Sequence, residues 1–228
     1  MDRRVLLASG AAAAVAAAGG AWYMTQKPGT TSIATVTPVA SEGNAENAEA
    51  GVDTTGITEM TLGSDDAKVT LMEYASFTCP HCASFHQSVF KDLKADYIDT
   101  GKVKFVYRDV YFDQFGLWAA LIARCDPSRF FGIADMLYAQ QKDWVGNGDP
   151  TGIADRLRKI GLVAGLDSDQ MSACLEDEDN ARALVAWFQQ NATADDVTGT
   201  PTLFIDGTKH SNMNYADLKV LLDTALES

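Results

Sequence analysis

The feature that most constrains this chain is a Cys-x-x-Cys pair placed directly after an apolar strand. Residues 68–75 are rich in β-branched and aromatic side chains and predict a buried strand, which a short turn ends. Cys79-Pro80-His81-Cys82 follows that turn. Pro80 suits the first turn of a helix, because its missing N–H would find no partner there and its fixed φ matches the helix. The cysteines are therefore expected where a strand passes into a helix.

The helix predicted after the turn makes the two sulfur atoms chemically unequal. Apolar residues recur at three- and four-residue intervals through residues 80–97, which indicates one helix of about five turns with one buried face. Cys82 is expected on that face and Cys79 at the exposed tip. Unpaired N–H groups and the helix dipole stabilise a thiolate at Cys79, and His81 can add a positive charge or a hydrogen bond. Because a stable thiolate makes a disulfide more oxidising, this pair is predicted to give disulfides away.

Cys-Pro-His-Cys after a strand resembles the active-site motif of the DsbA family of thioredoxin-fold thiol oxidases. Glu73 lies six residues before Cys79, as in that family. Residues 199–207 are similar to the cis-proline loop of the thioredoxin fold, followed by a strand and an Asp-Gly turn. The resemblance implies that this loop faces the cysteine pair. Pro201 and the backbone of Thr200 would then hold a substrate peptide beside Cys79.

The resemblance also implies a mechanism and its partners. Cys79 and Cys82 would carry the disulfide, tuned by Pro80 and His81, and would pass it to cysteines of unfolded or reduced exported proteins. A quinone-linked membrane protein of the DsbB type would reoxidise the pair, and no cofactor is expected. Glu73 is expected to handle the proton of Cys82 during exchange, although a carboxylate at the edge of that strand can also simply reach solvent.

The first part of the chain predicts export. Residues 1–24 combine a charged start, Arg3-Arg4, with an alanine-rich apolar core, which is typical of an export signal. The arginine pair fits a twin-arginine signal but is also ordinary charge for such a segment. The apolar run is borderline in length for a membrane anchor, so cleavage and permanent tethering both stay open. The protein is expected in the periplasm or another extracytoplasmic compartment.

Residues 25–56 are expected to form a disordered linker, because large apolar side chains are almost absent and no period appears. Isomerases of related families dimerise through a folded N-terminal domain, which such a segment cannot form. A monomer is therefore expected. The net charge of −13 argues against a nucleic-acid partner, because phosphate binding needs a basic surface.

Residues 57–228 are expected to form one α/β domain with a thioredoxin-like fold, a central sheet with flanking helices. Strands are predicted at 57–62, 68–75, 103–110, 202–205 and 208–210. An all-helical subdomain is expected to be inserted at about 113–197. Its predicted helices are 114–124, 127–143, 151–162, 168–175 and 180–194, and a last helix, 215–226, closes the domain.

Two further cysteines, Cys125 and Cys174, lie in the helical block. Free cysteines seldom persist in an oxidising compartment, and the total of four is even. A structural disulfide between them is expected, with two buried thiols as the alternative. Such a bond would close a loop of about 50 residues and stabilise the fold by roughly 4 kcal/mol.

Other interpretations of these motifs stay open. A Cys-x-x-Cys pair can bind zinc, but structural zinc needs four ligands and no second pair has suitable spacing, so no metal is predicted. A reductase or isomerase of the same fold is the main alternative function, and the Pro80-His81 dipeptide argues against it. A non-catalytic peptide-binding module would use the groove alone. His86 and His210 are interpreted as surface residues.

Overall fold

The computed structural model describes residues 51–228. The predicted export signal, residues 1–24, and residues 25–50 of the predicted linker lie outside the described residues. Residues 51–228 form a mixed α/β domain around a sheet with the strand order β1-β3-β2-β4-β5. The strands are β1 (Met60–Leu62), β2 (Val69–Ala75), β3 (Val103–Asp109), β4 (Thr202–Ile205) and β5 (Thr208–Ser211).

The sheet contains one parallel pair and three antiparallel pairs. β2 runs parallel to β3, with Glu73 opposite Tyr107. Parallel neighbours need a long crossover connection, which the helices after β2 provide. β1 pairs antiparallel with β3, β4 with β2, and β5 with β4. Asp206 and Gly207 have φ of 47° and 81°, the left-handed conformation that a two-residue turn between β4 and β5 requires and that glycine adopts easily.

The crossover helix is broken, which corrects the prediction of one continuous helix over residues 80–97. It consists of α1 (Pro80–Gln87), α2 (Val89–Leu93) and a π-helical turn, η2 (Lys94–Ile98). The break lies at Ser88, whose φ of −121° and ψ of −75° are not helical. The Ser88 hydroxyl donates to the Ser84 carbonyl at 2.7 Å, and such bonding back to the preceding turn bends helices.

The helical insertion runs from α3 to α8. Its elements are α3 (Gln114–Arg124), η3 (Pro127–Arg129), α4 (Phe130–Ala139), α5 (Gln141–Val145), α6 (Pro150–Val163), α7 (Ser168–Glu176) and α8 (Glu178–Ala194). Aspartates cap several starts, as at α3, where Asp113 accepts from the Gly116 N–H. The predicted helix over residues 127–143 is three pieces, and the interruption at Gln140 directs the next side chain, Gln141, toward the start of α1.

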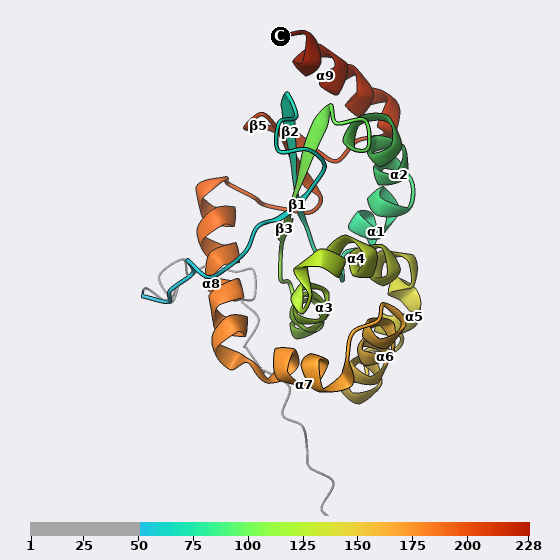
Figure 1. The fold of residues 1–228 in the computed structure, drawn as a ribbon, viewed down its shortest axis with the longest axis vertical. Coiled ribbons are helices and arrows are strands. Elements are labelled where there is room, and N and C mark those ends of the chain that lie inside the picture. The colour runs from blue at the N-terminus through green and yellow to red at the C-terminus, as the bar shows by residue number, and fades with distance from the viewer. Residues whose placement is uncertain (1–50) are drawn as a thin grey trace, which may run out of the picture. The chain divides into compact units, whose positions relative to one another are not determined.

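Side chains of the two central strands alternate between two faces of the sheet. On one side, here called the α1 face, Glu73 and Tyr107 lie against α1 and α4. On the other side, here called the α8 face, Tyr74 and Val110 pack with Phe188 of α8. Figure 1 shows α8 on one side of the strands and α1, α2 and the terminal helix α9 (Tyr215–Glu227) on the other.

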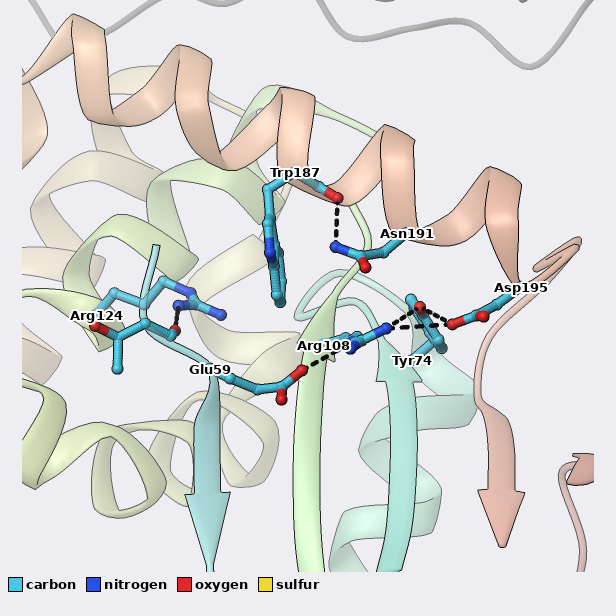
Figure 2. A network of polar contacts seen from close by, with 8 residues as sticks. Glu59, Tyr74, Arg108, Arg124, Trp187, Asn191 and Asp195 are labelled. Carbon is cyan, nitrogen blue, oxygen red and sulfur yellow. Dashed lines mark hydrogen bonds and ion pairs between the residues drawn. The ribbon is translucent and has the colours of Figure 1, made fainter. Parts of the chain in front are cut away.

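Two arginines fasten α8 to the sheet around Trp187 (Figure 2). The guanidinium carbons of Arg108 from β3 and Arg124 from α3 lie 5.6 and 5.7 Å from the centre of the Trp187 ring. These two arginines, Trp187 and the acidic partners Glu59, Asp109 and Asp195 are called the arginine cluster below. The cluster joins the strand side chains to the last helix of the insertion.

A disulfide closes the insertion, and it joins the two cysteines that were expected to pair. Cys125, after α3, and Cys174, in α7, have Cα atoms 5.7 Å apart. The bond spans 49 positions of the chain. Among residues 51–228, no helix has both the length and the apolar character needed to cross a membrane.

Candidate active site

The cysteine pair lies at the start of α1, between β2 and the helix, as the strand and helix signals predict. Cys79 is the N-cap residue and Pro80 occupies the first turn. Cys82 is completely buried, whereas Cys79 is 8% exposed. The expectation of an exposed tip at Cys79 is therefore wrong: its Sγ lies 3.5 Å from the Thr200 carbonyl, so the loop before β4 covers much of it.

The two thiols differ strongly in acidity. A hydrogen bond from the Cys82 thiol is the largest cause that lowers the pKa of Cys79, and the Thr200 side chain and the N–H groups of Cys82 and His81 add to it. Together they outweigh burial and bring this pKa from 9.0 to about 5. Burial is the main cause that raises the pKa of Cys82 far above its ordinary value, followed by Cys79 and the charge of Glu73. Cys79 is thus the thiolate and Cys82 the thiol of the reduced pair.

His81 acts on the thiolate through its backbone. Its side chain is exposed, and its contribution to the low pKa of Cys79 is a hydrogen bond from the main-chain N–H. The positive charge or side-chain hydrogen bond expected from His81 is not needed to explain that pKa. The N–H groups at the helix start, where Cys79 is the N-cap, add to the larger effect of the Cys82 thiol on this pKa.

The loop before β4 faces the cysteines, and its Thr200–Pro201 peptide bond is cis. Pro201 is buried. The buried Thr200 Oγ1 has no hydrogen-bond partner in the described part of the dithiol structure. This hydroxyl helps to lower the pKa of Cys79, so it can donate a hydrogen bond to the Cys79 thiolate. The loop therefore presents both a carbonyl and a hydroxyl to the reactive sulfur.

Glu73 lies on the α1 face under the cysteine pair and is completely buried. The alternative that its carboxylate reaches solvent at a strand edge is therefore wrong. Its Oε2 is 2.8 Å from Nε2 of His86, which is 3% exposed. This also corrects the interpretation of His86 as a surface residue: it lies one turn after Cys82 on the buried side of α1. His210 on β5 is half-buried.

Two residues from the insertion hold the active-site turn and were missed in the sequence. The buried Gln141 amide donates to the carbonyls of Phe77 and Cys79 at 2.8 and 2.9 Å. The Asp113 carboxylate accepts from the Thr78 hydroxyl at 2.8 Å. An aspartate before the predicted helix at 114 was a visible capping signal, but its second contact depends on tertiary packing. The insertion thus fixes the backbone that carries Cys79.

Within residues 51–228, no group of three or more His, Cys, Asp or Glu side chains is arranged to hold a metal ion. Two thiols of unequal acidity beside a cis-proline loop can instead form, transfer and re-form a disulfide.

Comparison with known proteins agrees with this geometry. Residues 55–224 match the family described as Thioredoxin. The chain belongs to the thioredoxin family. This thioredoxin-family protein is similar to a Rickettsia bellii protein named as a protein-disulfide oxidoreductase, with 32% identity over 171 residues that cover 74% of the chain and 65% of the relative. It is also similar to disulfide bond formation protein D of Bacillus subtilis, with 27% identity over 73% of the chain and 76% of the relative.

Solved structures show the same likeness. The thioredoxin-family protein superimposes on alpha-DsbA1 of Wolbachia pipientis with a TM-score of 0.68 and 25% identity, covering 75% of the chain and 92% of that structure. BdbD of Bacillus subtilis gives a TM-score of 0.65 and 25% identity over 75% of the chain and 94% of that structure. The predicted resemblance to the DsbA family and the predicted α/β, thioredoxin-like fold are confirmed. The chain spans 65% of the Rickettsia relative's length, less than two thirds.

Proposed function

We propose that this protein is a thiol oxidase that donates the Cys79–Cys82 disulfide to reduced cysteines of other proteins. The observation that carries the proposal is the difference between the two sulfurs: the pKa of Cys79 is lowered to about 5 and that of Cys82 is raised. A stable thiolate at Cys79 stabilises the reduced form, and a pair that prefers to be reduced oxidises its partners. The names of the relatives support the same chemistry.

The reaction proceeds in two exchanges. A substrate thiolate attacks Sγ of Cys79, the Cys79–Cys82 bond breaks, and its electron pair goes to Cys82, which takes up a proton. A second substrate thiolate then attacks the substrate sulfur of the mixed disulfide and releases Cys79 as a thiolate. The substrate is oxidised by two electrons and the protein pair is reduced. The Thr200–Pro201 loop, which faces Cys79, would hold the substrate backbone during both steps.

The biological setting belongs to the same proposal. Residues 1–24 would direct export to the periplasm or an equivalent compartment, where unfolded or reduced exported proteins are the substrates. The reduced pair would be reoxidised by a quinone-linked membrane protein of the DsbB type, and the protein would act as a monomer. Separate tests would follow the fate of residues 1–24 by fractionation and the oligomeric state by light scattering.

A redox titration against glutathione tests the direction of transfer. The pair would be followed in a Cys125→Ser/Cys174→Ser variant, so that only Cys79 and Cys82 respond. A midpoint close to the roughly −120 mV of DsbA supports the oxidase, because such a pair gives up its disulfide to most protein thiols. A midpoint close to the roughly −270 mV of thioredoxin would overturn it in favour of a reductase.

A Cys79→Ala variant separates catalysis from simple peptide binding. The oxidase should lose all turnover of a reduced model protein, because no thiolate remains to form the mixed disulfide. A Ser84→Ala variant is the matched control, since Ser84 is an exposed residue of the same helix. Unchanged biological activity of Cys79→Ala would instead indicate a binding module that uses the groove alone.

A further inference from the structure

The buried pair of Glu73 and His86 has a placement that the exchange reaction alone does not explain. Cys82 and His86 are four residues apart on α1, so both side chains lie on the side of the helix that faces β2. His86 Nε2 and Glu73 Oε2 are 2.8 Å apart, and their side chains are 4% and 0% exposed. An acid and a base therefore share a hydrogen bond under the sulfur that must leave.

The surroundings of His86 shield this hydrogen bond from most contact with water. The imidazole stacks on Tyr138 of α4 with ring centres 4.2 Å apart and lies against Phe90 of α2 at 4.7 Å. The titratable groups that face it are Cys82 from α1, Glu73 from β2, Tyr107 from β3 and Tyr138 from α4. The hydroxyls of Tyr107 and Tyr138 bond to each other at 2.6 Å.

The basic partner in this pair is an imidazole. In the described residues, the basic side chain that contacts Glu73 is His86, and no lysine or arginine forms an ion pair with it. An imidazole gives up and regains a proton near neutral pH, which a guanidinium does not do. The second carboxylate oxygen, Glu73 Oε1, is buried and has no hydrogen-bond partner among the described residues. The charge of Glu73 is near enough to raise the pKa of Cys82.

When the disulfide opens, the Cys82 sulfur needs a proton. Cys82 leaves as a thiolate in a completely buried position, where a charge is poorly solvated and the carboxylate of Glu73 repels it. A hydrogen-bonded carboxyl and imidazole can hold one proton more than a carboxylate and a neutral imidazole do. Glu73 Oε1 has no hydrogen-bond partner among residues 51–228, which leaves this oxygen free to carry a proton toward the sulfur.

We propose that His86 is a positioning residue for this exchange: its hydrogen bond to Glu73 holds the proton that Cys82 takes up when the Cys79–Cys82 disulfide opens. The inference rests on the proposed function and adds to it a residue and a source of the proton. In this step the two electrons of the broken S–S bond go to Cys82, and the proton moves from the Glu73–His86 pair to the Cys82 sulfur. Glu73 is then a carboxylate and His86 a neutral imidazole. Solvent protons then restore it.

The test is the pH profile of disulfide opening in the full chain. The rate of reduction by glutathione is followed in single turnovers through the tryptophan fluorescence, from pH 5 to pH 9, and divided by the concentration of glutathione thiolate. In the wild-type protein this normalised rate is expected to fall as the pH rises, with the titration of one group, because the pair must be protonated. A flat normalised profile in the wild-type protein would overturn the proposal.

Two variants then assign the titration. His86→Gln keeps a hydrogen-bond donor for Glu73 but cannot titrate, so it is expected to flatten the profile and to slow opening by about 100-fold at pH 6, the lower end of general-acid effects. His210→Gln, which removes the half-buried imidazole of β5, is the matched control and should keep the wild-type profile. A wild-type profile in folded His86→Gln would show a merely structural role and overturn the proposal.

The outcome is separable from the proposed direction of transfer. The pH profile measures proton uptake on opening whether the protein acts as an oxidase or a reductase. A midpoint near that of thioredoxin with a His86-dependent profile would overturn the proposed function alone. If His86→Gln does not fold, the pH profile and the solvent isotope effect of the wild-type protein still test the proposal. An opening rate that is equal in light and heavy water, after correction for the concentration of thiolate, would exclude proton transfer from the pair in the opening step.

Discussion

The Glu73–His86 pair and the arginine cluster both bury charge against the sheet, but they do so with different basic groups. In the arginine cluster each guanidinium has several partners: Arg108 donates to Glu59 and Tyr74, and Arg124 donates to Asp109 and to the Thr58 carbonyl. Figure 2 shows Arg108 linked to Glu59, to Tyr74 and to Asp195, the residue that ends α8. The Glu73–His86 pair has one hydrogen bond and a cysteine as its neighbour.

The comparison teaches that an unpaired buried atom does not by itself mark a reactive site. Both regions contain a buried carboxylate oxygen without a partner among the described residues, Oε1 of Glu73 and Oδ1 of Asp109. Asp109 lies beside Arg124, whose proton does not leave in proteins. Glu73 is hydrogen-bonded to an imidazole and its charge acts on a thiol, and both of these groups exchange protons. The Glu73–His86 pair therefore differs from the arginine cluster in whether its proton can move, more than in how deeply its charge is buried.

The largest expected difference between the regions is in their response to pH. A lowered pKa at Cys79, about 5 against 9.0, stabilises the folded reduced protein fully above pH 9, and this contribution is lost as the pH falls through about 5. The disulfide form has no such proton. The stability of the reduced form relative to the oxidised form should therefore rise from pH 5 to pH 9, as measured by urea unfolding of both.

Cys82 should not disturb this measurement below pH 9. Its pKa is raised, so the folded protein keeps the Cys82 proton throughout the window and a loss of stability from this group begins only above the ordinary value of 9.0. The oxidised protein is the internal control, because it contains the arginine cluster but no free thiol at the active site. Parallel pH curves for the two forms would contradict a stabilised thiolate at Cys79.

The second prediction concerns the most buried ion pair of the arginine cluster. Arg124→Leu should destabilise the protein by about 3–5 kcal/mol, because it leaves Asp109 buried without its counter-charge. The two side chains are 6% and 2% exposed, and burial already raises the pKa of Asp109 with Arg124 present. Urea unfolding measures the loss. The midpoint of the Cys79–Cys82 pair should stay unchanged, since this cluster does not touch the sulfurs.

A double variant sharpens the same result. Arg124→Leu combined with Asp109→Asn removes the orphaned charge and should recover part of the lost stability. Equal losses in the single and double variants would mean that packing against Trp187 and Phe130, the two rings beside the guanidinium, matters more than the ion pair.

The third prediction tests whether the insertion can be weakened without changing the active site. Replacing Cys125 and Cys174 by serine opens a loop with a sequence separation of 49 and should cost about 4 kcal/mol in the chain-entropy account. The redox midpoint of the Cys79–Cys82 pair should remain within the error of the titration. A large shift in that midpoint would show that the disulfide positions Gln141 or Asp113 against the active-site turn.

These contrasts explain which parts of the molecule could be predicted from the sequence. The strand at Thr202–Ile205 and the helix at Gln114–Arg124 follow from local signals, namely β-branched residues before an Asp-Gly turn and an amphipathic period. The motif at Cys79 and Cys82 is equally local. What could not be predicted depends on packing between distant segments, as with Gln141, which lies 62 positions from the carbonyl of Cys79 that it binds.

His86 illustrates the limit most clearly. Its distance of four residues from Cys82 was a signal for the buried side of the helix, but histidine is intermediate in its preference for burial and the default favoured the surface. The deciding fact is the partner, Glu73, which lies on the strand that packs against α1. Similarly, the break at Ser88 arises from a hydroxyl that bonds to its own helix, which a hydrophobic period does not report.

The last and smallest prediction concerns the half-exposed side of the arginine cluster. Arg108→Leu should destabilise the protein by about 1–2 kcal/mol, because the hydrogen bonds to Tyr74 and Glu59 are lost but water can reach the site. The side chains of Arg108 and Asp195 are 20% and 31% exposed, so the carboxylate keeps a solvated alternative that the buried Asp109 lacks. Arg108→Lys is the matched variant: it keeps the charge but not the fork of donors, and should recover less than half of the loss in urea unfolding. Arg108→Leu could instead destabilise the protein as much as Arg124→Leu does. Solvent access would then not explain the difference expected between the two arginines, and their shared contact with the Trp187 ring would contribute more than their ion pairs.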